Sequence, residues 1–145
     1  MKLRRRLEYA FARADLDFHD YGIFIAWQER SAFLGLLKKA DVFLDTLGFS
    51  GFNTAMQAVE CGLPVVTLEG RFMRGRLAAG IMRRMGLSDM VAGSQEEYIK
   101  LVVRLAKDEG YNKFIRQRIE AGRFEIFDDI APVQAMEDFI CSVVK

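Results

Sequence analysis

The chain has 145 residues, of which 51% are hydrophobic and two are proline, a composition that can bury a core and excludes intrinsic disorder. Its net charge of +1 excludes a general electrostatic attraction to nucleic acid or to an acidic partner. The sequence has neither an apolar run of about 18 residues, as a membrane helix needs, nor a secretion signal. We therefore expect a cytoplasmic protein with no nucleic-acid or membrane partner.

Cysteine and arginine are placed unevenly along the chain. Cys61 and Cys141 lie in apolar helical settings with no His or second Cys at metal-ligand spacing, so we predict buried reduced thiols and no metal site. One arginine cluster, at residues 4–6, is predicted to be a solvated helix face. The second flanks the candidate ligand loop described below, so a solvated face and a ligand-facing role both stay open; it comprises Arg71, Arg74, Arg76, Arg83 and Arg84.

The spacing of apolar residues predicts helices that alternate with strands. Helical spacing occurs at about residues 3–15, 29–39, 53–61, 72–85, 95–106, 110–122 and 132–144. Short apolar runs predict strands at 23–27, 42–45, 65–68 and 90–92. Gly62 and Pro64 mark the end of the helix at 53–61. Ser94 and Glu97 form a capping box that begins the helix at 95.

Strands that alternate with helices are typical of a parallel sheet. We predict an α/β fold, a Rossmann-like, doubly wound parallel sheet of about four strands, in a single domain over residues 1–145. Residues 1–20 hold a leading helix, and residues 94–145 hold the C-terminal helices. Such sheets normally have about five or six strands, so we expect an incomplete lobe. Its unpaired strand edge favours self-association or pairing with another polypeptide.

The segment from Gly48 to Thr54 is the candidate ligand site, because it joins the strand at 42–45 to the helix at 53–61. Ligands of open α/β sheets bind at the carboxyl ends of strands, and a helix N-terminus there offers free N–H groups to an anion. The hydroxyls of Ser50 and Thr54 add two possible hydrogen bonds to phosphate. An ordinary N-cap, in which Ser50 or Asn53 satisfies its own helix, explains the same spacing equally well.

Asp41 and Asp45 lie four residues apart on one predicted strand, so both point to the same face. At ~3.3 Å per residue they are about 13 Å apart, too far to share a metal. Asp45 stands at the carboxyl end of the strand. We predict that its carboxylate fixes the ligand loop by accepting backbone N–H groups.

An ordered set of motifs resembles the C-terminal catalytic lobe of the O-linked N-acetylglucosamine transferase family, including its SPINDLY-type members. The resemblance covers about residues 20–142, and it is carried by residues 40–46 (Ala-Asp-Val-Phe-Leu-Asp-Thr), Gly51, Thr54, residues 61–68 (Cys-Gly-Leu-Pro-Val-Val-Thr-Leu), Gly70, Arg76, Ala79, Gly86, Leu87, Glu97 and Tyr98. It implies an inverting glycosyltransferase of the GT-B type, with two Rossmann-like lobes. The C-terminal lobe holds most of a UDP-sugar, which is the donor substrate, and no cofactor is implied.

The resemblance also implies which residues of this chain hold the donor. Ser50, Gly51, Phe52, Asn53 and Thr54 correspond to the loop that grips the diphosphate, although Phe52 and Asn53 depart from the family pattern. Phe52 offers a phosphate only its backbone. Gln57 stands where the family has an Asp that binds the ribose, and an amide lacks the charge that strengthens such a bond.

The resemblance implies catalytic roles for two arginines. Arg76 matches an arginine of the family, and Arg30 lies near the position of a lysine of the family. Arg76 is expected to stabilise the diphosphate charge or to tether the neighbouring loop. Arg30 falls near a family lysine that neutralises the leaving diphosphate. His19, the only histidine, is predicted to be a surface residue, so the chain shows no evident general base.

The sequence therefore predicts the donor-binding half of an O-linked N-acetylglucosamine transferase-like enzyme that transfers a sugar to a hydroxyl of a protein acceptor. We expect the chain to be inactive without the N-terminal lobe that relatives carry. The alternative is a non-catalytic, Rossmann-like interaction module that has lost nucleotide binding, which the departures at Phe52 and Gln57 support. A GT-B lobe of another family fits the Leu-Asp-Thr run less well.

Overall fold

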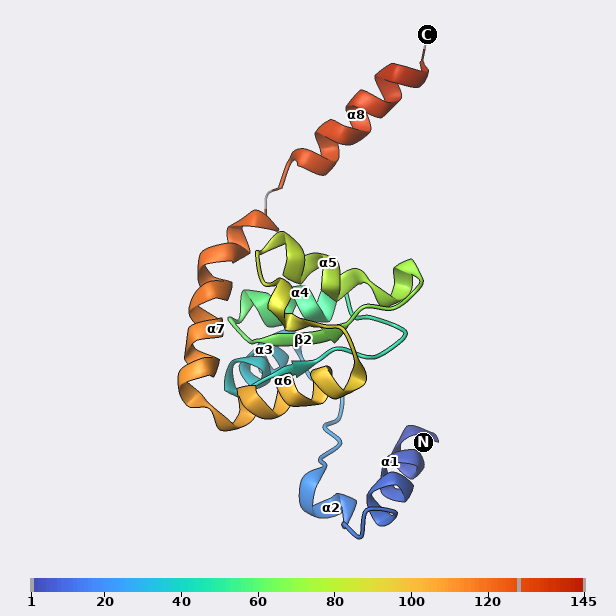
Figure 1. Cartoon of the computed structure of the whole chain (residues 1–145), viewed down its shortest axis with the longest axis vertical. Helices are drawn as coiled ribbons and strands as arrows, with labels where there is room; N and C mark the ends of the chain where they lie inside the picture. Colours follow the sequence, from blue (N-terminus) through green and yellow to red (C-terminus); the bar gives the residue numbers. More distant parts are fainter. Residues whose placement is uncertain (1, 128, 145) are drawn as a thin grey trace. The chain divides into compact units, whose positions relative to one another are not determined.

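The computed structural model describes residues 2–127 and 129–144 (Figure 1). The chain divides into two compact units, residues 1–30 and residues 31–145. Each unit is described by itself below.

The N-terminal unit is a pair of helices, α1 (Lys2–Ala12) and α2 (Phe18–Tyr21). The ring of Phe18 packs edge-on against that of Phe11, with 5.3 Å between their centroids. The Asp17 carboxylate caps α2 by accepting the N–H of His19 at 2.8 Å. Helix α1 is shorter than the expected 3–15 helix, because Asp15 adopts a positive φ of 58°, which a right-handed helix cannot contain.

The strand predicted at residues 23–27 is not formed, so that prediction is wrong. Residues 22–29 carry no helix or strand. The side chains of Ile23 and Trp27 are 87% and 81% exposed. A strand is stabilised by hydrogen bonds to a neighbour and by burial of a face, and this run has neither among the described residues. Its apolar composition alone therefore misled the prediction.

The C-terminal unit alternates helices with short strands. Its elements are α3 (Arg30–Lys39), β1 (Phe43–Leu44), α4 (Asn53–Glu60), β2 (Val65–Leu68), the 3-10 turn η1 (Met73–Gly75), α5 (Leu77–Arg84), η2 (Ser88–Met90), β3 (Val91–Ala92), α6 (Gln95–Lys107), α7 (Glu109–Gly122), η3 (Arg123–Glu125) and α8 (Ala131–Val143). The first residue of α3, Arg30, belongs to the N-terminal unit.

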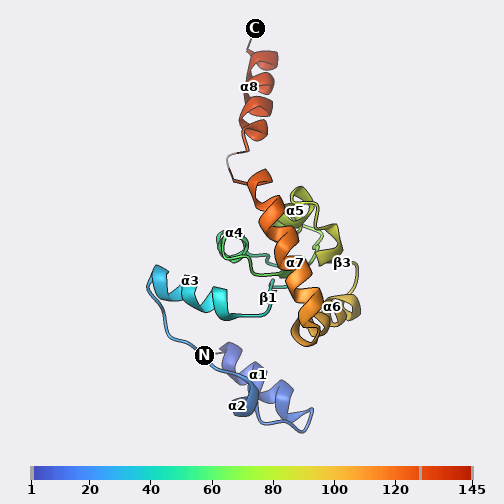
Figure 2. The ribbon, with the colours of Figure 1, turned by 90° about the vertical axis from the view of Figure 1, so that its left-hand side faces the viewer.

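Within the described residues the sheet has three parallel strands in the order β1-β2-β3. This confirms the predicted α/β, Rossmann-like class, with three strands in place of about four because the run at 23–27 does not join. Helices α4 and α5, which connect the strands, lie on one side of the sheet, and α6 lies on the other (Figures 1 and 2). All three helices contact β2, so β2 is covered on both faces, as its apolar sequence predicts.

The core lies between β2 and its covering helices. Its fully buried members include Ala55, Ala58 and Val59 of α4, Val65 and Val66 of β2, Ala78 and Met82 of α5, Leu87 and Met90 after α5, and Ile115 and Ile119 of α7. The sequence signals for element ends are confirmed at Gly62 and at the Ser94 cap, but the Glu97 carboxylate accepts the N–H of Gly93 at 2.7 Å instead of that of Ser94, so the capping box is not reciprocal. Gly62 has a φ of +68° after α4, and the Ser94 hydroxyl accepts the N–H of Glu97 at 3.1 Å at the start of α6.

Arg116 of α7 fastens that helix to the strand layer. Its guanidinium donates to the carbonyl oxygens of Ala40 at 2.6 Å and Gly62 at 3.0 Å, and to the side-chain oxygen of Asn112 at 2.7 Å. Asn112 in turn donates to the carbonyls of Asp41 and Leu105. One half-buried cation thus satisfies carbonyls at the end of α3 and after α4, at the amino-terminal side of the sheet.

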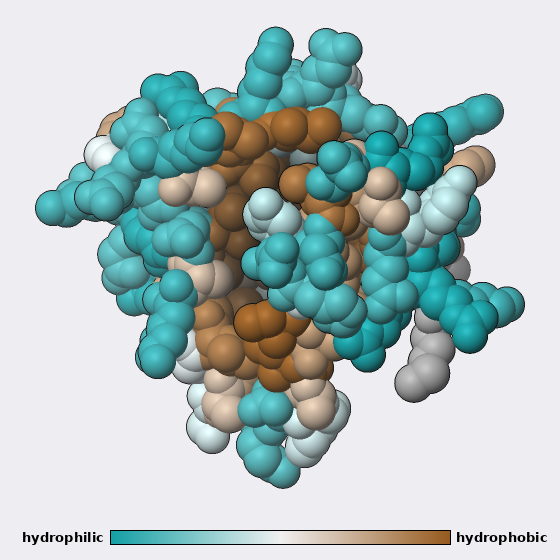
Figure 3. Space-filling model, turned by 90° about the horizontal axis from the view of Figure 1, so that it is seen from below, coloured by the Kyte–Doolittle hydropathy of each residue, from teal (hydrophilic) through white to brown (hydrophobic). Residues whose placement is uncertain are grey.

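Several apolar side chains stay at the surface. On α8 none of the described residues is buried, and its apolar positions are exposed, namely Val133, Met136, Phe139, Ile140 and Val143. Brown, apolar side chains also show between hydrophilic ones in the space-filling view (Figure 3). Cys141, predicted to be buried, is exposed because it lies on α8. Among the described residues, no helix is both long enough and apolar enough to cross a membrane.

Candidate functional site

The candidate site is the loop between β1 and α4, at the carboxyl end of β1. Asp45 directly follows that strand and is only 4% exposed. Its carboxylate accepts hydrogen bonds from the Ser50 hydroxyl, the Gly51 N–H and the Thr67 hydroxyl, each at 2.7 Å. Ser50 and Gly51 belong to the loop, and Thr67 belongs to β2. Asp45 therefore fixes the loop against the sheet, as the sequence predicts.

The structure gives the Ser50 hydroxyl a different role from the expected contact with phosphate. Besides donating to Asp45, this hydroxyl accepts the N–H of Ala78 at 2.9 Å, near the start of α5. The residue is 2% exposed. Its backbone N–H donates to the carbonyl of Arg74 at 2.7 Å. Ser50 thus joins the loop to α5, and its hydroxyl is already committed.

Tyr98 of α6 is a further support of the loop that the sequence analysis did not assign to the site. Its hydroxyl donates to the backbone carbonyl of Asp45 at 3.0 Å. Burial of the ring, and then the nearby Asp45 charge, raise the pKa of Tyr98 to about 12. The phenol therefore stays protonated and can donate throughout the neutral range. The sequence signals for it were its place at the fourth position of a capped helix and its membership of the motifs that carry the family resemblance.

The N-terminus of α4 is not capped by a side chain, which removes the N-cap explanation for this spacing. Phe52 occupies the cap position and makes no side-chain hydrogen bond there. The first helical bond runs from the N–H of Met56 to the carbonyl of Phe52 at 2.9 Å. Within the described residues, the N–H groups of Asn53, Thr54 and Ala55 have no hydrogen-bond acceptor. These donors are suited to an anion at the helix end.

Gly51 is needed where it stands because the loop turns tightly around Thr54. A Cβ added to Gly51 would lie 2.8 Å from the Thr54 hydroxyl oxygen and 3.6 Å from a carboxylate oxygen of Asp45. Thr54 and Asn53 are exposed, while Gln57 is half-buried one turn further along α4. The structure thus brings Gly51, Asn53, Thr54 and Gln57 to one helix end.

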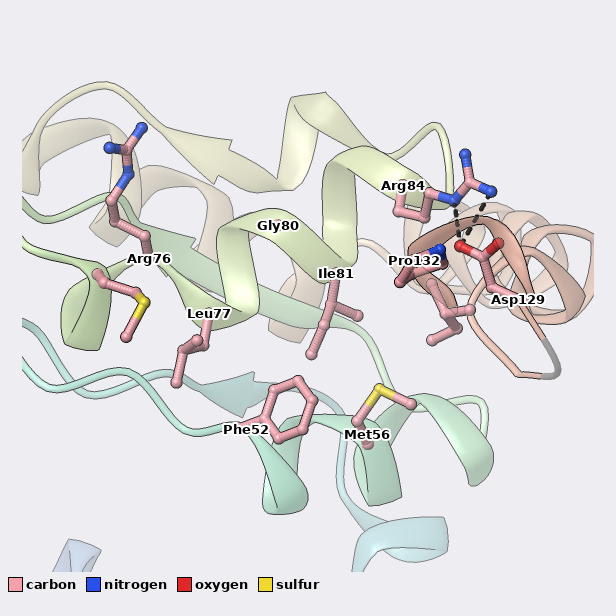
Figure 4. Close-up of a pocket in the computed structure, with 11 residues that line it drawn as sticks. Phe52, Met56, Arg76, Leu77, Gly80, Ile81, Arg84, Asp129 and Pro132 are labelled. Carbon is pink, nitrogen blue, oxygen red and sulfur yellow. Dashed lines mark hydrogen bonds and ion pairs between the residues drawn. The ribbon is translucent and has the colours of Figure 1, made fainter. Parts of the chain in front are cut away.

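Phe52 faces a separate, apolar groove of about 550 Å³ between α4 and α5. Phe52 and Met56 lie opposite Leu77 and Ile81 across this groove (Figure 4). At one end of the groove, Arg84 pairs with Asp129 at 3.0 Å. The aromatic side chain that departs from the family pattern is therefore turned toward apolar neighbours, and only its backbone belongs to the loop.

Arg76, the candidate catalytic arginine, is held by Glu69. Its Nε donates to a carboxylate oxygen of Glu69 at 2.6 Å, and Arg83 donates to the other oxygen. These two hydrogen bonds lower the pKa of Glu69 to about 2, and the Glu69 bond raises the pKa of Arg83. Glu69 follows β2 and Arg76 precedes α5, so the pair tethers the connecting loop. The guanidinium of Arg76 is half exposed.

Neither a metal site nor the role of Arg30 emerges from the geometry. Among the described residues, no three His, Cys, Asp or Glu side chains lie close enough to hold a metal ion. Arg30 begins α3 in the N-terminal unit, and its role at the diphosphate stays a prediction.

Comparison with known proteins agrees with the fold and the motifs. The family model described as Glycosyl transferase family 41 matches residues 25–131. A UDP-N-acetylglucosamine–peptide N-acetylglucosaminyltransferase of Giardia intestinalis is 34% identical over 88 residues, which are 61% of this chain and 6% of that protein. The protein of the same name from Caenorhabditis elegans is 30% identical over 108 residues, covering 73% of this chain and 9% of its own length.

A solved structure extends the likeness to three dimensions. A mutant of the O-GlcNAc transferase of Thermobaculum terrenum superposes with a TM-score of 0.80 and 32% sequence identity, over 94% of this chain and 26% of that one. The chain thus spans about a quarter of that structure and less than a tenth of the two curated relatives. The match to the family model covers most of the chain. Motifs that carry the resemblance lie on β1, on β2 and on the loop after β1. The chain belongs to glycosyl transferase family 41.

Proposed function

We propose that this chain forms the region of an O-linked N-acetylglucosamine transferase-like enzyme that binds the UDP-sugar donor. The observation that carries the proposal is the uncapped N-terminus of α4, held at the carboxyl end of β1 by Asp45. A helix end with free N–H groups and a positive dipole attracts a diphosphate. Membership of the family and the names of the similar proteins support UDP-N-acetylglucosamine as the donor.

In this proposal the N–H groups of Asn53 and Thr54, with the Thr54 hydroxyl, bind the diphosphate. Gly51 lets the backbone approach it, because this position carries no side chain. The amide of Gln57 binds the ribose hydroxyls one turn along α4. Arg76 and Arg30 supply positive charge as the diphosphate departs.

The reaction we propose for the whole enzyme is a direct displacement. The oxygen of an acceptor hydroxyl forms a bond to the anomeric carbon, while the bond from that carbon to the diphosphate oxygen breaks and UDP leaves with the electron pair. This inverts the anomeric centre. Donors already in place where negative charge develops stabilise the transition state. The residues of this chain serve the leaving group, and the base that takes the hydroxyl proton is not assigned to it.

The side chain of Phe52 supports one other candidate function. It lies against the apolar groove and adds nothing to the diphosphate site, while Gln57 lacks the charge of an acidic ribose ligand. A chain that kept the scaffold but no longer binds nucleotide, acting through protein contacts alone, accounts for both changes.

Calorimetric titration of the purified chain with UDP and with UDP-N-acetylglucosamine separates the two candidates. We expect saturable binding that weakens about tenfold, or about 1.4 kcal/mol, in Thr54→Ala. Gln57→Ala is expected to weaken binding of UDP but not of pyrophosphate, since it removes only the ribose contact. Ser88→Ala, an exposed hydroxyl at the start of η2, serves as the matched control. Absence of heat at millimolar nucleotide, with a folded chain, would exclude donor binding.

A further inference from the structure

The loop of residues 70–75, between β2 and α5, is closed at its base by its own backbone. The N–H of Gly70 donates to the carbonyl of Gly75 at 2.7 Å. A Cβ on Gly70 would lie 3.1 Å from that carbonyl oxygen, and one on Gly75 would lie 3.2 Å from the Cα of Gly70. Two further bonds, from Gly75 to Phe72 and from Arg76 to Met73, close the turn within. The tip therefore projects from a narrow, hydrogen-bonded base.

This loop, which we call the basic loop, is fixed to the donor loop. The N–H of Ser50 donates to the carbonyl of Arg74 at 2.7 Å. A Cβ on Gly75 would lie 3.5 Å from the carbonyl oxygen of Gly48. The backbones of the two loops thus touch at the carboxyl edge of the sheet, and whatever binds the tip of the basic loop lies beside the donor site.

The tip combines exposed apolar side chains with two arginines. Phe72 and Met73 are 57% and 79% exposed. The guanidinium groups of Arg71 and Arg74 lie 5.7 and 4.9 Å from the centroid of the Phe72 ring. In the part of the chain that the structure describes, neither arginine forms an ion pair with a carboxylate, whereas Arg76 and Arg83 share Glu69. The positive charge of the tip is therefore uncompensated.

Charge is concentrated in this part of the sequence. Residues 69–84 contain five arginines and one glutamate, a net charge of +4, whereas the whole chain carries +1. Arg, Met and aromatic residues are enriched in protein interfaces. A loop already fixed by backbone hydrogen bonds also loses little entropy when a partner binds.

We propose that the tip of the basic loop, Arg71 to Arg74, binds an acidic segment of the protein acceptor. The inference rests on the proposed function, because the acceptor hydroxyl must approach beside the bound donor. Carboxylates of the acceptor pair with Arg71 and Arg74, since a guanidinium binds a carboxylate through two parallel hydrogen bonds. An apolar side chain within the acidic segment covers Phe72 and Met73.

Fluorescence anisotropy of a labelled peptide tests this. The probe is a short peptide rich in glutamate with a central phenylalanine, and the comparison peptides replace glutamate by glutamine or by lysine. The double variant Arg71→Glu/Arg74→Glu reverses the charge of the tip. Lys107→Glu/Lys113→Glu makes the same change in net charge on exposed positions of α6 and α7, and is the matched control. Thermal unfolding by circular dichroism checks that both variants fold.

We expect the acidic peptide to bind at least about tenfold more tightly than the glutamine peptide, with an affinity that falls as salt rises. Arg71→Glu/Arg74→Glu should lose this preference, and the control protein Lys107→Glu/Lys113→Glu should keep it. UDP affinity measured on the same proteins should be equal, which separates this inference from donor binding. Equal binding of acidic and glutamine peptides, or an unaltered preference in the basic-loop variant, overturns the inference. So does displacement of the peptide by UDP, or tighter binding of an RNA oligonucleotide at the same arginines.

Discussion

Replacing Asp45 by asparagine is the sharpest test of how the donor loop is held. One carboxylate oxygen accepts the N–H of Gly51, and the other accepts the hydroxyls of Ser50 and Thr67. An asparagine whose oxygen faces the N–H of Gly51 must turn its NH₂ group toward both hydroxyls. In the parent these two hydroxyls donate to the carboxylate, so donor would then face donor. The Thr67 hydroxyl can rotate to accept. The Ser50 hydroxyl already accepts the N–H of Ala78. If it also accepts from the asparagine NH₂ group, its proton loses the carboxylate to which it donates in the parent.

The size of the effect follows from these three bonds. Hydrogen bonds to a charged group contribute about 1.5–3 kcal/mol each, and neutral ones about 0.5–1.5 kcal/mol. The loss summed over the three bonds is offset in part because a buried charge is removed, so Asp45→Asn should lower the free energy of unfolding by about 2–4 kcal/mol. Thr67→Val, which removes one bond and keeps the shape, should cost about 1.5–3 kcal/mol.

Urea unfolding at neutral pH, followed by circular dichroism, measures both variants. With a slope of about 2 kcal/mol per molar urea, a loss of 3 kcal/mol lowers the midpoint by about 1.5 M. Asp41→Asn, an exposed carboxylate near the other end of the strand, should stay within about 0.5 kcal/mol of the parent. A loss below about 0.5 kcal/mol in Asp45→Asn, with an unchanged slope, would refute the view that this carboxylate holds the loop.

Three further predictions concern the scaffold. Arg116→Met keeps the aliphatic stem but removes the hydrogen bonds that fasten α7, and should cost about 2–4 kcal/mol in the same urea assay; a neutral effect would contradict the fastening role. Gly122→Ala places a Cβ 2.7 Å from the carbonyl oxygen of Met85. Helix α7 must then shift away from the end of α5, so the thermal midpoint should fall; a midpoint equal to that of the parent would show this contact to be soft. Because its folded-state pKa is lowered from 4.5 to about 2, Glu69 contributes stability that is present above pH 4.5 and lost as pH falls toward 2. Acid titrations of Glu69→Gln should lack this part of the transition, and an unchanged acid profile would count against the paired carboxylate.

The fold could largely be predicted because the strongest sequence signals are local. The sequence predicts a strand at residues 65–68, and the structure has one there. A short apolar run directly after Gly62 and Pro64 favours a buried strand over a continued helix. The predicted strand at 23–27 failed because an apolar run says nothing about whether a neighbouring strand exists to pair with it. Cys141 was misplaced for a similar reason, since the helix around it formed without burying that position.

The site was predicted only in part, because its supports come from distant segments. Asp45 was identified as the residue that fixes the loop, since a carboxylate at a strand end has few other roles. Tyr98, 53 residues further on, could not be found from spacing. Ser50 looked like a phosphate ligand because nothing local shows that its hydroxyl meets Ala78. Thr67, a polar residue inside an apolar strand, was a sequence signal for a buried hydrogen bond at this end of the sheet.

Because one carboxylate receives hydrogen bonds from two loop residues and from β2, changes at these positions should be strongly epistatic. Once Asp45 is replaced, Thr67→Val should cost much less than it does in the parent, since its hydroxyl has already lost the charged acceptor. Residues that share these hydrogen bonds are then expected to change together during evolution and not one at a time. A relative that lacks the aspartate is expected to have changed the strand threonine with it, whereas the loop serine still has the N–H of Ala78 to accept.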